Sequence, residues 1–288
     1  MKIEIICPLY NAANMVIELH QSLLRQVDVP QLKITYVLTR STDQTAQILQ
    51  ENNLPYTEIE PKEFSHSLTR EKFALQSDAD ILVFITQDIY VADDSWLSNL
   101  IKPIIASECE AAFSRQVSRY KGIEQYTREF NYPAVSFVNT STDLATKGMK
   151  AFAFSDAAGA VKTTIFRELG GYDGLDLPSN EDMYLAYKII THGYRIKYCA
   201  DSIVYHSHHF TLKQLYHRYY LSGQALGQIP ELNQYDTTKA GGGLAKYVLK
   251  RALKKFDILT LLRFVPDMAA RYLGMKKGLK SISQKGKS

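Results

Sequence analysis

Strand-like and helix-like segments alternate along the first part of the chain, and this alternation constrains the fold more than any other feature. Apolar, β-branched runs are each followed by a segment whose apolar residues recur with a helical period. In chain order, the strands are expected at 2–7, 32–38 and 80–85, and the helices at 12–26, 43–53, 67–77 and 94–107. Short turns between such segments are typical of a mainly parallel sheet covered by helices. The sequence therefore predicts an α/β fold.

Three polar turns follow the predicted strands, at 8–11, 39–43 and 86–88. Because ligands bind beyond the carboxyl ends of the strands in open α/β sheets, we expect these turns to lie together at one edge. The chain has no GxGxxG after its first strand and no GxxxxGK[ST] segment. The phosphate-binding loops of dinucleotide-binding and P-loop proteins are therefore not expected.

Asp88 stands just beyond the apolar strand and has no basic neighbour in sequence. A carboxylate in this position suits a hard divalent cation, which prefers one or two carboxylates together with phosphate oxygens. The alternative is that Asp88 caps the next helix, but Asp93 and Asp94 already precede that helix. We therefore favour a metal ligand over a helix cap.

A second group of acidic residues lies within the segment 170–209. Ser179 or Asn180 can cap a helix that carries Glu181 and Asp182 in its first turn. The residues expected on the apolar face of this helix are Met183, Ala186, Tyr187 and Ile190, before a glycine at 193. Acidic residues also favour helix N-termini because of the helix dipole, so these residues alone leave catalysis and a purely structural role about equally supported.

Bulk properties restrict the class of protein. With 288 residues and 45% apolar content, the chain can bury a sizeable core. Its apolar runs are much shorter than the roughly 20 residues that span a bilayer, and its start does not resemble a signal peptide. The cysteines, Cys7, Cys109 and Cys199, are far apart and lack CxxC spacing. This predicts neither disulfides nor a zinc site and favours a reducing cytoplasm.

Charge divides the chain into two parts, which we expect to be a catalytic domain at 1–238 and a basic helical tail at 239–288. The tail holds 13 Lys or Arg against two Asp, a net charge of +11, which leaves −7 for the rest. Apolar residues between 244 and 262 gather on one side of a helical projection, and we expect Pro266 to kink or end this helix. A basic amphipathic helix is typical of proteins that lie on an anionic membrane surface. The alternative is a helix that docks on the acidic body of the protein.

Six short motifs occur in an order that resembles family 2 glycosyltransferases of GT-A fold, over about residues 2–225. They are PLYNA at 8–12, STDQT at 41–45, TQD at 86–88, GGYD at 170–173, NED at 180–182 and VYHSHH at 204–209. Together with HSLTRE at 66–71, they are similar in particular to the bacterial rhamnosyltransferase group. The resemblance implies a Rossmann-like, nucleotide-sugar-binding fold with a mixed, mainly parallel sheet and flanking helices, to which the basic C-terminal helices are added.

The resemblance assigns the donor site to residues that follow the strands. The expected nucleotide-sugar-binding residues are Pro8, Tyr10, Asn11, Thr39, Ser41, Asp43, His66, Arg70, Thr86 and Gln87. His66 and Arg70 match an HxxTR element that approaches the diphosphate. The chain departs from the family at two places. Many relatives carry an acid that binds the pyrimidine where this chain has Leu38, Thr39 and Arg40, and Glu71 replaces the usual Asn.

The same resemblance assigns the reacting groups. Asp88 takes the metal-binding position of the DxD motif, with Thr86 in place of the first acid, and would hold Mg²⁺ or Mn²⁺ against the diphosphate. His206 or His208 matches a late histidine that can complete the metal shell, and an imidazole suits Mn²⁺ better. Asp182 matches the catalytic base that takes the proton of the acceptor hydroxyl. The expected acceptor-side residues are Gly171, Tyr172 and Glu181.

The resemblance implies an inverting glycosyltransferase that passes a sugar from a nucleotide donor to a growing bacterial glycan. The expected donor is dTDP-rhamnose, and the expected acceptor is a lipid-linked saccharide at the inner face of the cell membrane; no nucleic acid partner is expected. The QxxRW element of processive synthases is missing, so transfer of single residues or short blocks is expected. The alternatives are a UDP-hexose transferase of the same fold and a nonenzymatic nucleotide-sugar-binding module.

Overall fold

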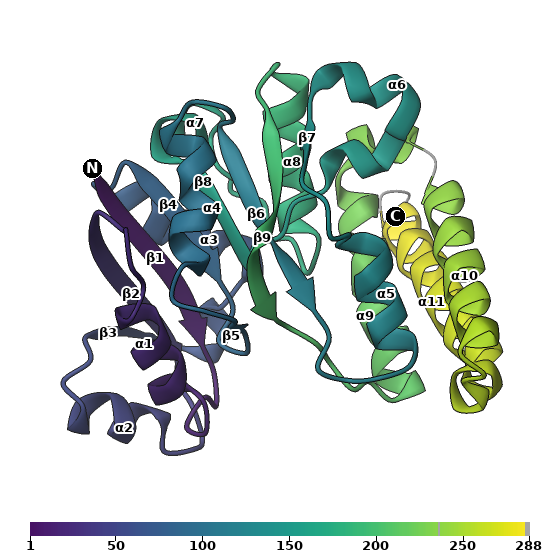
Figure 1. Ribbon diagram of the computed structural model, residues 1–288, viewed down its shortest axis with the longest axis horizontal. Helices are drawn as coiled ribbons and strands as arrows, with labels where there is room; N and C mark the ends of the chain where they lie inside the picture. The colour runs from purple at the N-terminus through teal and green to yellow at the C-terminus, as the bar shows by residue number, and fades with distance from the viewer. Residues whose placement is uncertain (236, 286–288) are drawn as a thin grey trace.

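The computed structural model describes residues 1–235 and 237–285 and has a mixed β-sheet flanked by helices (Figure 1). Its strands are β1 (Lys2–Leu9), β2 (Gln31–Thr39), β3 (Tyr56–Ile59), β4 (Ile81–Ile85), β5 (Tyr90–Val91), β6 (Ala111–Val117), β7 (Phe137–Asn139), β8 (Ala158–Lys162) and β9 (Ile196–Tyr205). Its α-helices are α1 (Val16–Leu24), α2 (Thr45–Glu51), α3 (His66–Gln76), α4 (Trp96–Ile105), α5 (Ile123–Asn131), α6 (Leu144–Lys147), α7 (Thr163–Glu168), α8 (Glu181–Thr191), α9 (Leu212–Gln228), α10 (Thr237–Lys254) and α11 (Ile258–Lys285). The sheet order is β3-β2-β1-β4-β8-β6-β9-β5, and β7 pairs with β9.

The first half of the sheet is the parallel unit that the sequence predicts. β1 runs parallel to β2 and β4, and β2 runs parallel to β3. Side chains alternate along β1, so that Ile5 and Cys7 lie in the hydrophobic core with α1 and α4, whereas Ile6 lies in the core with α3 and α7. Burial on both faces explains why these strands read as continuous apolar runs in the sequence.

The second half of the sheet is built around an antiparallel strand. β8 lies between β4 and β6 and runs antiparallel to both. β9 runs parallel to β6 and carries two short antiparallel strands, β7 at its beginning and β5 at its end. The pairing of Tyr90 with Tyr205 brings the turn after β4 next to the residues that follow β9.

The C-terminal helices α10 and α11 dock on other helices of the protein (Figure 1). Val248 and Ala252 of α10 are fully buried and form a small core with Ile123 and Tyr126 of α5. α11 packs along α9. The basic tail is therefore docked on the body, which is the alternative that the sequence left open.

The expected single helix at 244–262 is wrong. The segment 244–262 is not one helix, because the chain turns between α10 and α11, where Phe256 has a left-handed φ of 52°. Asp257 precedes α11 and accepts hydrogen bonds from the backbone N and the hydroxyl of Thr260 at 3.0 and 2.8 Å, as N-cap residues do. Pro266 lies inside α11 and does not end it.

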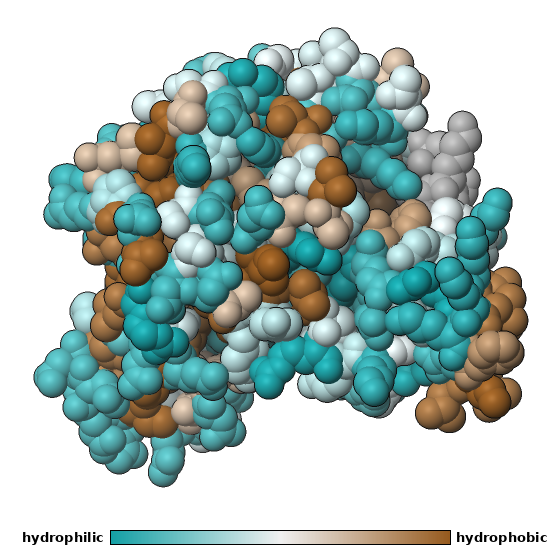
Figure 2. All heavy atoms as spheres, viewed as in Figure 1, coloured by the Kyte–Doolittle hydropathy of each residue, from teal (hydrophilic) through white to brown (hydrophobic). Residues whose placement is uncertain are grey.

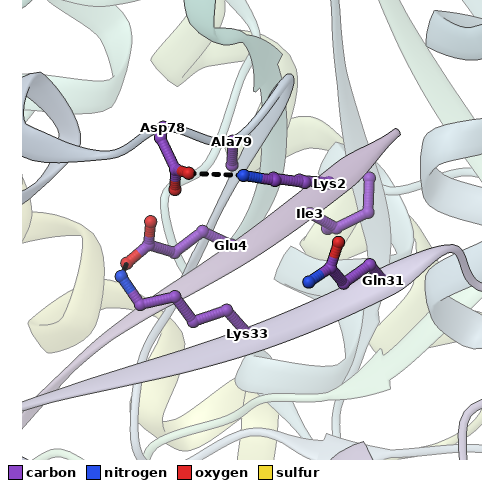
Figure 3. Close-up of a pocket in the computed structure, with 7 residues that line it drawn as sticks. All are labelled: Lys2, Ile3, Glu4, Gln31, Lys33, Asp78 and Ala79. Carbon is purple, nitrogen blue, oxygen red and sulfur yellow. Dashed lines mark hydrogen bonds and ion pairs between the residues drawn. The ribbon is translucent and has the colours of Figure 1, made fainter.

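A small hollow of about 120 Å³ lies at the amino-terminal ends of β1 and β2, away from the polar turns, and Figure 3 shows the residues that line it. Glu4 is buried there and accepts hydrogen bonds from Thr35 and Ser77. Lys33 adds an ion pair at 2.8 Å. Because the protein itself supplies all these partners of the carboxylate, we assign this hollow a structural role.

Candidate active site

The polar turns that follow β1, β2 and β4 meet at one edge of the sheet, as the sequence predicts. The side chain of Gln87 accepts a hydrogen bond from the backbone N of Tyr10 at 2.7 Å and donates one to its carbonyl at 2.9 Å. The backbone N of Asn11 donates to Oγ of Ser41, and its Oδ1 accepts from the N of Thr42, both at 2.9 Å. We call the set formed by these five residues the polar rim.

Asp43 ties two helices to the polar rim. Its carboxylate accepts hydrogen bonds from the backbone N of Ala13 and of Thr45, both at 3.0 Å, and from the Thr45 hydroxyl. Burial raises the pKa of Asp43, but the hydrogen bonds from Thr45 and Ala13 together outweigh it and hold the pKa below its usual value. Asp43 thus joins the turn before α1 to the start of α2 at this edge of the sheet.

Other expected donor-site residues lie along the same edge. Tyr10 is 50% exposed and can stack on a ligand, whereas Pro8 is partly buried near the end of β1. The hydroxyls of Thr39 and Thr86 are buried and have no hydrogen-bond partner among the described residues. His66 begins α3 and is exposed. These side chains offer an aromatic face and unused polar groups beside the polar rim.

Asp88, His206 and His208 come together next to this edge, although the sequence left the two histidines as alternatives. Oδ2 of Asp88 lies 3.5 Å from Nε2 of His206 and 3.6 Å from Nδ1 of His208. One ligand atom from each residue lies within 4.8 Å of the other two. The neighbouring His209 is exposed and packs against Tyr120 instead.

Hydrogen bonds fix the ring orientation of His206. Its Nδ1 lies 2.9 Å from Oε1 of Gln116, and Nε2 of Gln116 donates to Oγ of Ser155 at 2.8 Å. Arg128 also donates to Oε1 of Gln116. Because this amide oxygen can only accept, His206 donates from Nδ1 and turns the lone pair of Nε2 toward Asp88.

The electrostatics of the cluster suits a divalent cation. Burial lowers the pKa of His206, and burial together with the neighbouring imidazole lowers the pKa of His208 to about 4. A carboxylate and two neutral imidazoles therefore face one another, and this donor set fits Mn²⁺ or a similar ion.

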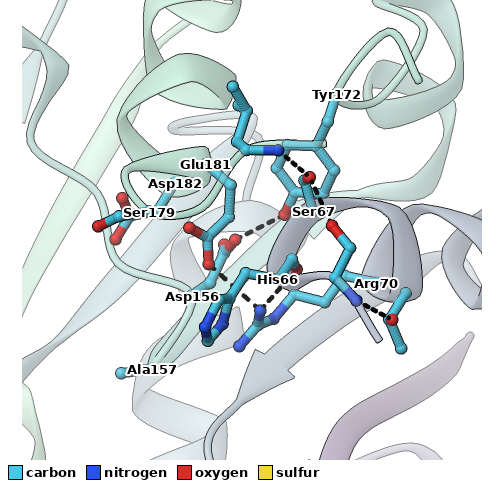
Figure 4. Close-up of polar contacts among 12 residues, drawn as sticks. His66, Ser67, Arg70, Asp156, Ala157, Tyr172, Ser179, Glu181 and Asp182 are labelled. Carbon is cyan, nitrogen blue, oxygen red and sulfur yellow. Dashed lines mark hydrogen bonds and ion pairs between the residues drawn. The ribbon is translucent and has the colours of Figure 1, made fainter. Parts of the chain in front are cut away.

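A buried ionic cluster lies between α3 and α8 (Figure 4). Arg70 is 2% exposed, and its Nη1 lies 3.2 Å from Oε1 of Glu181 and 2.8 Å from the carbonyl of His66. The hydroxyl of Tyr172 donates to Oδ2 of Asp156 at 2.6 Å. Nε of Arg70 and Oδ1 of Asp156 are buried and have no hydrogen-bond partner in the described part of the chain. The ion pair thus leaves Arg70 with an unused donor.

Asp182 lies in the first turn of α8, beside this cluster. Its Oδ1 accepts a hydrogen bond from the backbone N of Met183 at 2.7 Å. Burial, and then the charges of Glu181 and Asp156, raise the pKa of Asp182 well above its usual value. A raised pKa makes a carboxylate a better proton acceptor, which suits general base chemistry. Asn180 does not cap this helix as expected, because its φ is 60° and its side chain makes no cap bond.

The structure corrects two expected acceptor contacts. Tyr172 is fully buried, with its hydroxyl bonded to Asp156 and its backbone N bonded to Glu71 at 2.6 Å. Gly171 is also buried, and a Cβ there would lie 2.9 Å from the ring of Phe166. An acceptor therefore cannot contact either residue, and Glu71 fastens this turn to α3.

Sequence reasoning does not single out Asp156 or Gln116. Asp156 precedes β8 in the largely apolar segment AFSDAAGA. An acidic residue inside such a segment indicates a buried carboxylate, and this was the only local sign of its role. Gln116 is a fully buried residue of β6, and it stands among the polar residues of that strand, so the sequence gives no signal that sets it apart. Their partners lie far away in sequence, so neither contact is readable from local pattern.

The family is established by a sequence profile. The profile of Glycosyl transferase family 2 matches residues 4–170, more than half of the chain. The chain belongs to glycosyl transferase family 2. The matched part of this glycosyltransferase contains Arg70 and Asp88, whereas Asp182, His206 and His208 lie beyond it.

Relatives and solved structures agree with this assignment. The chain is 30% identical over 292 aligned positions to the O-antigen chain rhamnosyltransferase RfbN of Salmonella typhimurium, covering 96% of this chain and 90% of the relative. The structure resembles the mannosyltransferase PcManGT from Pyrobaculum calidifontis, solved in complex with GDP-Man and Mn²⁺ (TM-score 0.61, 18% identity, 98% of this chain and 86% of that chain). It also resembles TarS of S. aureus, solved in complex with UDP-GlcNAc (TM-score 0.56, 17% identity, 100% of this chain and 92% of that chain). The fold is thus the GT-A fold that the sequence predicts.

Proposed function

We propose that this glycosyltransferase transfers L-rhamnose from dTDP-rhamnose, with inversion at the anomeric carbon, to a lipid-linked saccharide precursor of a cell-wall or surface polysaccharide. The observation that carries the chemistry is the cluster of Asp88, His206 and His208 at the edge of the sheet where α/β folds bind nucleotides. The choice of rhamnose is supported by the 30% identity to a rhamnosyltransferase over nearly the whole of both chains.

The donor nucleotide is proposed to lie along the polar rim. Tyr10 is exposed there and can stack on the base. Thr39 and Thr86 lie behind this edge with buried hydroxyls and are proposed to shape the site for the ribose and the phosphates. Arg70 is buried, and its positive charge is proposed to attract the diphosphate. The residues proposed to shape this site are Pro8, Asn11, Ser41, Asp43, His66 and Gln87.

Asp88, His206 and His208 would hold a divalent cation. Two of the three ligands are imidazoles, which favours Mn²⁺ over Mg²⁺. When bound, such an ion neutralises negative charge on the leaving nucleoside diphosphate. Gln116 keeps the Nε2 lone pair of His206 directed at Asp88, so the site is organised before the donor arrives.

Asp182 is proposed to act as the base. The acceptor oxygen attacks the anomeric carbon from the face opposite the leaving group, and the bond to the diphosphate breaks with its electron pair on the diphosphate oxygen. The proton of the acceptor hydroxyl passes to Asp182, whose protonated form is favoured by burial and by the charges of Glu181 and Asp156. Glu181, which pairs with Arg70, is proposed to position this first turn of α8 at the acceptor side.

A donor screen tests the proposed function. Purified protein is incubated in vesicle-free solution with dTDP-rhamnose, UDP-glucose, UDP-GlcNAc or GDP-mannose, and release of the nucleoside diphosphate is measured. Release from dTDP-rhamnose alone supports the proposal. Release from UDP-sugars alone would establish the UDP-hexose alternative, which the UDP-GlcNAc complex of TarS makes the second candidate. No release from any donor, with or without glycan acceptors, would leave a nonenzymatic nucleotide-sugar-binding module.

We also propose that catalysis and membrane attachment are carried by different parts of the chain. Residues 1–238 would carry donor binding and catalysis, and residues 239–288, with their net charge of +11, would hold the enzyme at the inner face of the cell membrane. A lipid-linked acceptor is confined to that membrane, so attachment would place the enzyme where its acceptor is.

A further inference from the structure

The outer side of α11 and the turn before it form an exposed apolar surface. Figure 2 shows apolar side chains protruding where α10 turns into α11, at the lower right. We call this surface the apolar outer face, and its main residues are Phe256, Leu259, Leu262, Val265, Tyr272 and Leu273, which are between 54% and 87% exposed. Leu259, Leu262 and Val265 follow one another at intervals of three residues, and Tyr272 comes two helical turns after Val265, which places the members in α11 on one side of the helix.

The opposite side of α11 is fixed against α9, so this exposure does not come from an undocked helix. A Cβ on Gly274 would lie 2.4 Å from the carbonyl oxygen of Tyr216, and one on Gly278 would lie 2.0 Å from that of Tyr220. Such short distances mean that the two helix backbones approach closely at the glycines. The packing therefore determines which side of α11 faces outward, and that side is apolar.

The two helices that meet at the apolar outer face also carry exposed basic residues. Lys246, Lys250 and Lys254 are exposed on α10, one helical turn apart, and form no ion pair with any residue in the described ranges. Lys276, Lys277 and Lys280 are exposed near the other end of α11. Long basic side chains can keep their charge in water while their stems cover apolar surface. Exposed apolar residues bordered by unpaired lysines are the composition of helices that lie in a membrane interface.

The charge and the apolar character of this surface together favour a membrane over a second copy of the chain or a nucleic acid. A second copy of this chain would bring two tails of net charge +11 together, which is unfavourable. A nucleic acid would match the charge, but it would leave the large apolar side chains without an apolar environment. In the described residues, no helix combines enough length and hydropathy to span a bilayer. An anionic lipid surface offers an apolar environment to the apolar side chains and negative charge to the lysines.

We propose that the apolar outer face lies in the headgroup region of an anionic phospholipid bilayer, with the flanking lysines on the lipid phosphates. The proposal identifies the membrane-contacting surface, and it rests on the proposed function for the membrane attachment of residues 239–288 and for the lipid-linked acceptor. A cavity of about 560 Å³ connects this surface with the candidate metal site. His208 and His209 line the cavity together with Leu259 and Arg263 of α11. An acceptor whose lipid stays in the bilayer could therefore enter beside α11 and reach the metal cluster.

Vesicle co-sedimentation of the full-length protein tests the proposal. The test variant is the double substitution Leu262→Glu and Val265→Glu, at two side chains that are 73% and 70% exposed. The matched control is Leu24→Glu with Val135→Glu, which are 64% and 74% exposed and lie outside α10 and α11. With vesicles containing phosphatidylglycerol, the test variant should bind at least about 10-fold more weakly than wild type, because two apolar insertions are lost. The control should bind like wild type.

Further measurements separate membrane binding from changes in folding, in donor hydrolysis and in oligomeric state. Wild-type binding should weaken on pure phosphatidylcholine and in high salt, since the lysine contribution is electrostatic. The melting temperature and vesicle-free nucleoside diphosphate release of the test variant should match wild type, which separates membrane attachment from folding and from the proposed function. Wild-type-like sedimentation of the test variant, or no binding of wild type to anionic vesicles, would overturn the proposal. So would a stable dimer, seen by light scattering without vesicles, that the same double substitution dissociates.

Discussion

Nε2 of His206 lies 3.5 Å from Oδ2 of Asp88, while the other nitrogen of the same ring is held by Gln116 at 2.9 Å. This relationship depends on β5, a strand of two residues whose pairing with the end of β9 brings the turn after β4 to His206. The candidate metal site is therefore assembled by sheet topology and oriented by a buried amide.

Removal of the divalent cation should stop nucleoside diphosphate release, and added Mn²⁺ should restore it. Asp88→Ala should raise the Mn²⁺ concentration needed for half-maximal rate by about 10-fold or more, because the cluster loses its carboxylate. A Mn²⁺ titration of the initial rate measures this. His209→Ala, which changes the neighbouring exposed histidine, should keep the wild-type requirement. A full rate in excess chelator would contradict the metal assignment and leave Arg70 as the main diphosphate partner.

Gln116→Leu should weaken Mn²⁺ binding by about 10- to 100-fold without changing a metal ligand. Leucine has a similar volume but cannot accept the Nδ1–H of His206, so the Nε2 lone pair is no longer held toward Asp88. Calorimetric titration with Mn²⁺ in the absence of donor measures the affinity directly. Gln116→Glu keeps an acceptor for His206 and Arg128 and is the control that should retain most of the affinity. Equal affinities for the leucine variant and wild type would show that the ring does not need this support.

Asp182→Asn should lower the turnover of sugar transfer by about 10²-fold or more while leaving the affinity for the donor nearly unchanged. The amide keeps the shape of the carboxylate but cannot take the proton of the acceptor hydroxyl. Initial rates at saturating donor, together with donor binding in the absence of acceptor, separate the two effects. Turnover above a tenth of wild type would remove Asp182 from the role of base.

The elements that the sequence predicts well are those with strong local periodicity. β1, β2 and β4 appear where continuous apolar runs stand, and the helices between them where apolar residues recur with the helical period. α1 begins at Val16, later than the expected start at 12, because helix boundaries carry weaker signals than helix interiors. The gathering of the three turns also follows from local pattern, since parallel strands end at the same edge.

The parts that escape prediction depend on contacts between distant segments. β5 and β7 have two and three residues, which is too short for any periodic signal. β8 is rich in small residues and inserts antiparallel between β4 and β6, a position that only the whole sheet determines. The break between α10 and α11 contains neither Gly nor Pro, although Asp257 followed by Thr260 is a capping pattern that marks the start of α11. Asp156 approaches Tyr172 only after the chain has folded.

Asp156→Asn should make the protein more stable at neutral and alkaline pH. Burial is the main cause that raises the pKa of Asp156 to about 7. The folded state therefore binds a proton that the unfolded state has released between about pH 4 and pH 7, so the free energy of unfolding should fall as pH rises through this window. The amide stays neutral and can still accept from Tyr172, so the variant should lack this fall. Melting temperatures at pH 5 and pH 8 measure it, and the same pH dependence in both proteins would contradict the assignment.

Two glycine substitutions should have opposite effects on stability, although both replace a helical glycine by alanine. At Gly242 of α10, no heavy atom lies within 4 Å of an added Cβ, so the alanine should raise the free energy of unfolding by roughly 0.5–1 kcal/mol through helix propensity. At Gly278 of α11, the added Cβ would lie 2.0 Å from the carbonyl oxygen of Tyr220 and 2.9 Å from the backbone N of Gln224. Because backbone atoms cannot move aside without separating α9 from α11, this alanine should cost about 1–3 kcal/mol. Urea unfolding measures both values, and a stabilising alanine at both positions would show that α11 does not pack against α9 in solution.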